Sequence, residues 1–215
     1  MKTPPRRLAL PLALAAAVLL LWDTFVVYPF RLFVVFLHEI SHGLAALATG
    51  GSIVSIGLSF DEGGVCLTRG GSPFLILNAG YLGSLLWGAL FLLLGGRRSR
   101  ARSVIAVVGF FTLAVTLVYV RTWFGFFYGL AAGMVLLAVA AELKPAVSET
   151  LLACIGATSV LYAVWDVVTD VLLRHSGLSD AAALARATGV PAIVWGVAWM
   201  AFSVAVLVSV LRRLS

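Results

Sequence analysis

Two histidines and a glutamate within one short segment are the most chemically specific feature of the sequence. His38, Glu39 and His42 form the pattern His-Glu-x-x-His, and a spacing of four residues places both imidazoles on the same face of a helix. Two imidazoles placed in this way can donate nitrogen lone pairs to one Zn²⁺ ion, which then needs a third protein ligand and keeps a position for water. The segment therefore predicts a zinc site with Zn²⁺ as the cofactor.

Glu39 stands next to the predicted metal without having to bind it. Zinc lowers the pKa of a bound water toward about 7. A neighbouring carboxylate can take the proton as the water attacks a polarised carbonyl, and it can pass that proton to the leaving amine. We therefore expect Glu39 to be the general base of a hydrolase.

The third zinc ligand must come from elsewhere in the chain, and two carboxylates are the main candidates. Asp166 and Asp170 lie four residues apart in an otherwise apolar run, where like charges repel each other unless a cation is near. We expect Asp166, which lies one helical turn deeper in the run, to be the ligand. Asp170 is the alternative ligand or a hydrogen-bonding partner of a ligand histidine. A further interpretation is that Asp170 forms an ion pair with Arg174.

Other polar residues receive structural or supporting roles. Ser179 and Asp180 precede an alanine-rich run that ends near Gly189, which predicts a short N-capped helix at the membrane surface with Asp180 as a cap. His175 is expected to be a residue of a surface loop. Asn78 is a candidate for positioning substrate, and an interhelical hydrogen bond is an equally open interpretation.

The composition indicates what surrounds these residues. Of the 215 residues, 62% are hydrophobic and only 11% are charged, with a net charge of +6 and a mean hydropathy of +1.09. A water-soluble protein carries about 25% charged residues, so we expect a lipid bilayer as the partner of most of the surface. We expect no nucleic-acid partner, because the basic residues lie in short clusters between apolar runs. Two cysteines are too few for a disulfide framework or a cysteine-based zinc site.

Apolar segments long enough to cross a bilayer alternate with short polar connections. Residues 52–68 instead alternate apolar with small or polar side chains around a glycine-rich turn, which predicts a β-hairpin. The predicted fold is an all-α integral membrane protein with six to seven spanning helices and one β-hairpin after the zinc-binding helix, in a single domain over residues 1–215. We expect the first helix to be an uncleaved membrane helix rather than a signal peptide. The helices are expected at 8–28, 29–49, 73–95, 103–120, 122–141, 149–173 and 191–211.

The segments around the predicted metal resemble the site-2 protease family of intramembrane zinc metalloproteases, in particular its compact bacterial branch without a PDZ domain. The resemblance covers about residues 29–185. Better-known members carry their aspartate ligand in an Asn-Pro-x-Pro-x-x-Asp-Gly or Leu-Asp-Gly signature, which this chain lacks. The matching parts are the zinc helix at 36–43, Gly50-Gly51 with the hairpin after it, the small-residue helix at 78–84, and Trp165-Asp166 in the role of the family's aspartate ligand.

The resemblance implies a zinc metalloendopeptidase that cuts membrane-anchored proteins, with Glu39 as the base and with His38, His42 and Asp166 on the zinc. A helical substrate must unwind before it is cut, because its amides are already hydrogen-bonded. An exposed edge of the hairpin could hold the unwound segment by β-augmentation. The expected location is a prokaryotic plasma membrane.

Two non-proteolytic alternatives stay open. An ion transporter would use the same polar residues to line an ion path, but it would need polar sites in several spans. The helices expected at 103–120 and 122–141 contain no Asp, Glu, Lys, Arg or His, which favours one enclosed site. The other alternative is a pseudoprotease or assembly factor that keeps the fold without turnover, and an intact Glu39 argues against it.

Overall fold

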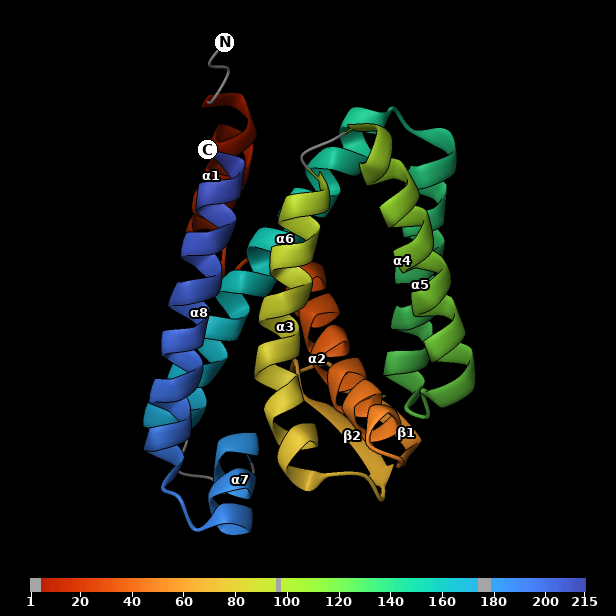
Figure 1. Cartoon of the computed structure of the whole chain (residues 1–215). Coiled ribbons are helices and arrows are strands. Elements are labelled where there is room, and N and C mark those ends of the chain that lie inside the picture. Colours follow the sequence, from red (N-terminus) through yellow and green to blue (C-terminus); the bar gives the residue numbers. More distant parts are fainter. Residues whose placement is uncertain (1–4, 96–97, 174–178) are drawn as a thin grey trace.

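In a computed structural model of the chain, which describes residues 5–95, 98–173 and 179–215, helices make up most of the fold and one β-hairpin lies near one end of the long helices (Figure 1). A π-helical turn, η1 (Thr169–Leu173), continues α6, and the hairpin follows α2. The hairpin strands are β1 (Ser52–Leu58) and β2 (Gly64–Arg69). The α-helices are α1 (Pro5–Leu20), α2 (Tyr28–Ala48), α3 (Pro73–Gly95), α4 (Arg98–Tyr119), α5 (Trp123–Glu142), α6 (Pro145–Val168), α7 (Asp180–Thr188) and α8 (Ala192–Leu214).

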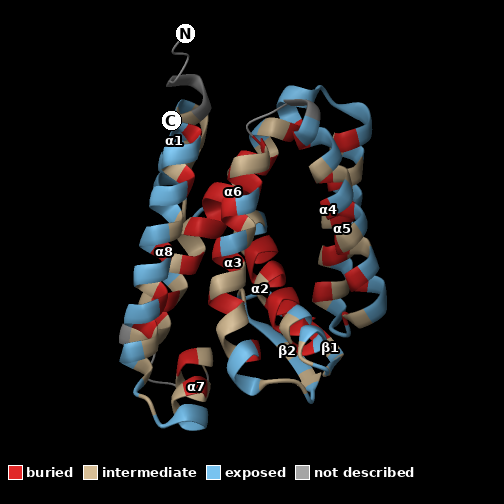
Figure 2. Cartoon of the chain, in the orientation of Figure 1, coloured by how far each residue is buried: buried red, intermediate tan, exposed pale blue. Residues whose placement is uncertain are grey.

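Six helices of the described chain are long and apolar enough to cross a membrane, namely α2, α3, α4, α5, α6 with the start of η1, and α8. Figure 2 shows that buried residues gather on α2 and α6, whereas α4, α5 and α8 have many exposed residues. The exposed residues of these three helices include large apolar ones such as Leu117, Phe127 and Val204. The protein is therefore an integral membrane protein, and the predicted fold of spanning helices with one hairpin is confirmed.

The first helix is shorter than predicted. We expected an apolar helix as far as Tyr28, but α1 ends at Leu20, and its apolar part is shorter than the six spanning helices. The Thr24 hydroxyl donates a hydrogen bond of 2.6 Å to the Leu21 carbonyl oxygen, and such local side-chain bonds compete with helical pairing. Pro29, which has no N–H to lose, then lies in the first turn of α2.

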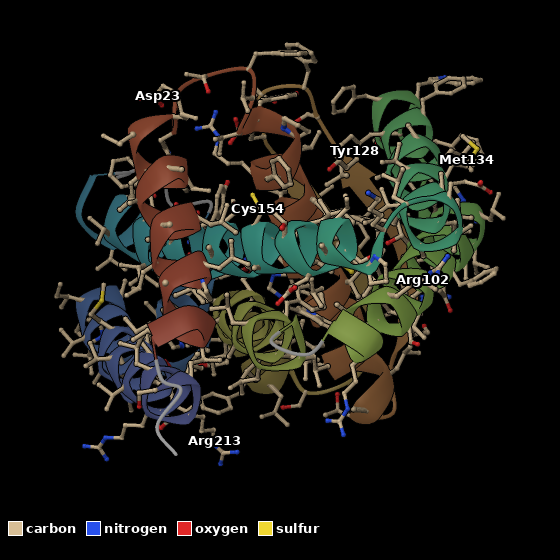
Figure 3. The ribbon with its side chains drawn as sticks, turned by 90° about the horizontal axis from the view of Figure 1, so that it is seen from above. Asp23, Arg102, Tyr128, Met134, Cys154 and Arg213 are labelled. Carbon is tan, nitrogen blue, oxygen red and sulfur yellow. The ribbon has the colours of Figure 1, made fainter. Side chains whose placement is uncertain are left out.

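α3 lies at the centre of the molecule, packed between α2 and α6. Seen from above, α6 crosses the molecule at a steep angle to the other helices (Figure 3). Two glycines allow this crossing: a Cβ atom at Gly88 of α3 would lie 2.9 Å from the carbonyl oxygen of Gly156 in α6. The Ser159 hydroxyl also donates a hydrogen bond of 2.7 Å to the carbonyl oxygen of Ser84. Small residues and interhelical hydrogen bonds are the usual means of close packing in membranes.

The two strands of the hairpin differ in how their outer edges are covered. β1 pairs antiparallel with β2, and its other edge meets the segment between α4 and α5. There Ile56 forms a bridge with Val120, and the Leu58 N–H donates a hydrogen bond of 3.0 Å to the Thr122 hydroxyl. Among the described residues the sheet has only these two strands, so β2 is an edge strand.

Replacing Gly88 by alanine is expected to destabilise the protein, although alanine is the better helix former. The added methyl group would lie 2.8 Å from a Val160 methyl carbon, so α3 and α6 would have to separate, at an overpacking cost of about 1–3 kcal/mol. The Tm measured in detergent should fall. Gly95→Ala is the matched control, because its methyl group would meet Leu152 at 3.6 Å, an ordinary contact. Equal Tm values for the two variants would contradict this account of the crossing.

Candidate metal centre

The two histidines of the sequence pattern lie on one face of α2, as their spacing predicts. Their ring centroids are 4.8 Å apart, and their side chains are only 12% and 8% exposed. Both line a cavity of about 420 Å³, which is also lined by residues from β2, α3, α6 and α7. The apolar residues around them in α2, from Leu32 to Leu37 and at Ile40, are buried, so packing fixes this stretch of the helix.

Hydrogen bonds orient both imidazole rings. His42 Nδ1 lies 2.7 Å from the carbonyl oxygen of Ile76 in α3. A carbonyl oxygen can only accept, so Nδ1 carries the hydrogen and the Nε2 atom of the neutral ring keeps its lone pair. His38 Nδ1 faces the Ser84 hydroxyl at 3.4 Å and a carboxylate oxygen of Asp166 at 3.8 Å. The carboxylate favours the same tautomer, which leaves both Nε2 atoms as donors to a metal.

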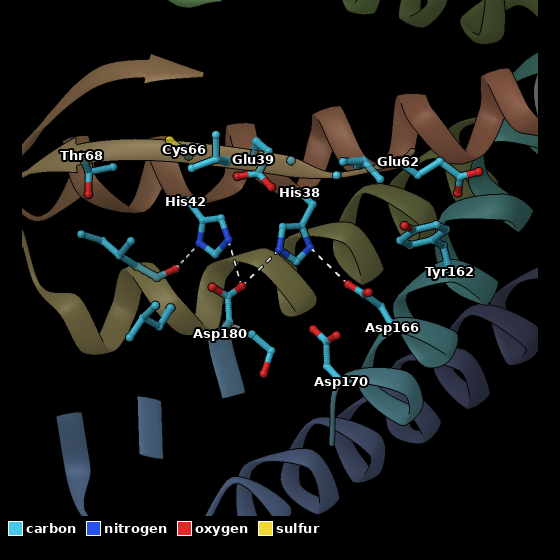
Figure 4. Close-up of a pocket in the computed structure, with 17 residues that line it drawn as sticks. His38, Glu39, His42, Glu62, Cys66, Thr68, Tyr162, Asp166, Asp170 and Asp180 are labelled. Carbon is cyan, nitrogen blue, oxygen red and sulfur yellow. Dashed lines mark hydrogen bonds and ion pairs between the residues drawn. The ribbon is translucent and has the colours of Figure 1, made fainter. Parts of the chain in front are cut away.

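Asp180 supplies a third donor between the two rings. Its Oδ2 atom lies 3.2 Å from His38 Nε2 and 3.0 Å from His42 Nε2, and Figure 4 shows the carboxylate pointing at both imidazoles. One donor atom from each of these three residues lies within 4.8 Å of the other two. Among the described residues, His38, His42 and Asp180 are therefore the group of side chains that could hold a metal ion.

The structure places the two aspartates favoured by the sequence analysis elsewhere around His38. Asp166 faces the Nδ1 edge of the ring, on the side opposite Nε2, because α6 passes His38 on that side. Asp170 accepts a hydrogen bond from the Tyr81 hydroxyl. Both line the cavity, but neither belongs to the group around the Nε2 atoms. The geometry therefore favours Asp180 over Asp166 as the third ligand.

Asp180 was predicted to be a helix cap, and the structure corrects this role. The short helix is present and ends at Gly189, as predicted. Its N-cap is Ser179, whose hydroxyl oxygen accepts a hydrogen bond of 3.3 Å from the Ala182 N–H, and Asp180 is the first helical residue. An aspartate in a first turn is favourable by itself, so the sequence carried no distinct signal for a ligand. His175 lies outside the described residues.

The local charges keep Asp180 available as a ligand. Burial alone would raise the pKa of the Asp180 carboxyl, but when no metal is bound, protonated His38 and His42 rings that donate hydrogen bonds to it outweigh burial and hold this pKa well below its usual range. A bound metal ion would replace those protons, and its positive charge would also favour the ionised carboxylate.

The space beside the three donors fits a metal ion. A Cβ atom at Gly80 of α3 would lie 2.3 Å from His38 Nε2 and 2.6 Å from His42 Nε2, so this space exists because residue 80 has no side chain. Two lone pairs and a carboxylate oxygen that converge away from water repel each other unless protons or a metal ion lie among them. The donor set, two imidazole nitrogens and one carboxylate oxygen, is one that divalent transition metals accept.

Glu39 lies beside this group and is not part of it. Its side chain is buried and lines the same cavity. A Cβ atom at Gly64 of β2 would lie 2.3 Å from Glu39 Oε1, so the backbone of the hairpin lies directly against the carboxylate. The arrangement predicted from the sequence, a carboxylate next to two imidazoles, is thus present.

The remaining predicted residue, Asn78, is not among the described residues that line the cavity. Its side-chain oxygen accepts a hydrogen bond of 2.8 Å from the indole N–H of Trp199 in α8, and its NH₂ group donates one of 2.8 Å to the Phe74 carbonyl oxygen. This is the interhelical bond that was the alternative interpretation.

Cys66 of β2 also lines the cavity. Burial, with a smaller contribution from the charge of Glu39, raises the pKa of its thiol to about 12.

Gly80→Ala is expected to weaken metal binding by at least about tenfold while the protein still folds. The new methyl group would displace both imidazoles, and loss of supporting geometry around a metal typically costs about 10–100-fold in affinity. Competition with a chelator of known affinity measures the effect, and Gly95→Ala serves as the control. Unchanged affinity in Gly80→Ala would show that the metal does not occupy this space.

Comparison with known proteins places the chain in a family. A family model described as Peptidase M50B-like matches residues 11–210, a range that contains both histidines, Glu39 and Asp180. No curated protein and no solved structure matches the chain. The matched family is a site-2 protease family, so the resemblance seen in the sequence is confirmed. The chain belongs to the Peptidase M50B-like family.

Proposed function

We propose that the protein is a zinc-dependent endopeptidase that hydrolyses peptide bonds of membrane-anchored proteins within the bilayer. The observation that carries the proposal is the convergence of His38 Nε2, His42 Nε2 and Asp180 Oδ2 beside a buried glutamate. Membership of a peptidase family and the position of both histidines in a spanning helix support it.

His38, His42 and Asp180 would hold the zinc ion. Two imidazole nitrogens and one carboxylate oxygen form the ligand set of several catalytic zinc sites, which leave a position for water or substrate. When bound, zinc supplies a Lewis acid that polarises the scissile carbonyl and makes water more acidic. Ile76 and Asp166 hold the Nδ1 sides of the two rings, and such partners raise the basicity of the ligands and fix their orientation.

Glu39 performs the proton transfers. Its carboxylate takes a proton from water as the water oxygen bonds to the substrate carbonyl carbon. It then delivers that proton to the amide nitrogen as the C–N bond breaks, so the products are a carboxylate and an amine. Burial against Gly64 keeps bulk water away from the carboxylate, and electrostatic effects are larger in such surroundings than in water.

The edge of β2 would hold the substrate. Gly64, Val65, Cys66 and Thr68 of this strand line the cavity together with the histidines, and β1 covers only the other side of β2. An unwound segment of a membrane helix needs new partners for its amides. Main-chain hydrogen bonds to an edge strand supply such partners without a strong demand on sequence.

Substitution of the two competing aspartates tests the ligand assignment. Asp180→Asn should remove stoichiometric zinc from the purified protein, because an amide is a much poorer ligand for this ion than a carboxylate. Asp166→Asn should retain zinc with an affinity lowered by about 10–100-fold, as expected for a partner of a ligand histidine. Zinc content and chelator competition provide the measurements. The reverse order of the two variants would restore Asp166 as the ligand.

Cleavage of a membrane-anchored reporter in proteoliposomes tests the proposed reaction. Glu39→Gln should bind zinc as wild type does but lose cleavage by a factor of at least about 10² to 10⁴, the usual contribution of general acid–base catalysis. Gly95→Ala should cleave normally. Zinc binding without cleavage by the wild type on any reporter would favour a pseudoprotease, and ion flux that depends on the same residues would favour a transporter.

A further inference from the structure

We propose that Arg31 and Glu62 form a clamp that sets the position of the hairpin turn against α2. The clamp thereby sets the position of β2 and of the hairpin backbone that lies against Glu39. Both would be positioning residues for the reaction. The inference rests on the proposed peptidase function, and its test includes a measurement that does not need activity.

The backbone of Glu62 gives the first indication. Its φ of 63° makes it the one non-glycine residue with positive φ among those that the structure describes. Glycine adopts this left-handed conformation without steric cost, whereas a residue with a Cβ atom is disfavoured there. The next two residues, Gly63 and Gly64, are glycines, but position 62 has a glutamate, so the side chain must contribute something that glycine cannot.

That contribution is a largely buried ion pair. Glu62 Oε1 lies 2.7 Å from Arg31 Nη2, and the two side chains are 18% and 15% exposed although Glu62 is part of a turn. The Arg31 guanidinium also lies 5.4 Å from the ring centroid of Trp22. Burial raises the pKa of the Glu62 carboxyl, and the charge of Arg31 offsets this only in part. Since desolvation cancels much of the attraction in buried pairs, the pair is better explained by the geometry it fixes than by stability.

This geometry is that of the active site. Glu62, Gly63 and Gly64 line the cavity together with Glu39, and Figure 4 shows Glu62 on the same side of the cavity as Glu39. Gly64 lies directly against the Glu39 carboxylate. A shift of the turn would therefore move both the backbone that lies against this carboxylate and the edge of β2. A second anchor, the hydrogen bond of 2.7 Å from the Tyr28 hydroxyl to the Phe60 carbonyl oxygen, keeps the turn near α2 when the clamp is lost.

Two variants remove the clamp in different ways. Glu62→Gly relieves the backbone strain but leaves Arg31 with only the exposed Asp23 carboxylate, at 3.7 Å, and the double variant Arg31→Met, Glu62→Gly removes both charges of the clamp. In each, kcat should fall and KM should rise, so that kcat/KM drops by about tenfold or more, as small misplacements of reacting groups cost up to about 10²-fold. Zinc content should be unchanged. The double variant should have a Tm at least equal to that of wild type and should lose no more activity than the single one, because the pair acts as a unit.

The matched control is Asp61→Asn in the same turn. Asp61 is exposed and accepts a hydrogen bond of 2.5 Å from the Ser59 hydroxyl, which asparagine can also accept. This variant removes one negative charge from the turn without touching the clamp, so its kcat/KM should equal that of wild type. A loss equal to that of Glu62→Gly would assign the effect to charge in the turn and would overturn the proposal.

Alkylation of Cys66 reports the position of the hairpin without any substrate. Cys154→Ala leaves Cys66 as the single thiol, and Cys66 is partly buried on β2. Its rate of reaction with N-ethylmaleimide should rise by about tenfold or more in both clamp variants, since local opening exposes protected groups, but not in Asp61→Asn. Faster alkylation in a protein whose wild type cleaves nothing would retain the clamp and refute the peptidase. Wild-type alkylation or wild-type kcat/KM in both clamp variants would refute the clamp.

Discussion

The mutual repulsion of three electron-pair donors is the constraint on which the rest of the structure depends. Two imidazole nitrogens and a carboxylate oxygen point at one small space that is screened from bulk water, and protons on the imidazoles or a metal cation must balance the charge there. The neighbouring elements position and support these three donors. α3 contributes Gly80 and the Ile76 carbonyl, α6 contributes Asp166, and the close α3–α6 crossing at Gly88 and Gly156 holds these contributions in place.

Local features of the fold and site were predictable from the sequence because they depend on residues close together in the chain. The spanning helices follow from the length of the apolar runs, and the pairing of His38 with His42 follows from the pitch of a helix. The hairpin follows from a change of period around a glycine-rich turn. The error at the end of α1 has the same origin, since most residues from Leu20 to Val27 are apolar while local hydrogen bonds around Thr24 end the helix.

The third donor was not predictable because it depends on how distant elements cross. Asp166 and Asp180 are separated from His42 by several helices, and the choice between them depends on which edge of the His38 ring each carboxylate meets. The crossing angle of α6 sets that edge, and no spacing in the sequence encodes this angle. An aspartate in a buried span also attracts attention, whereas an aspartate that begins a short surface helix has an ordinary structural explanation.

The location of Asp180 has a consequence for the apoprotein. Two donors belong to a long helix anchored in the bilayer, but the third belongs to α7, which has nine residues and packs mainly through Ala181 and Leu184. A ligand that binds only the assembled site stabilises that assembly by mass action, so the docking of α7 is thermodynamically linked to occupancy of the site. The supply of metal in the cell would then determine both how many copies can react and how firmly this part of the molecular surface is held.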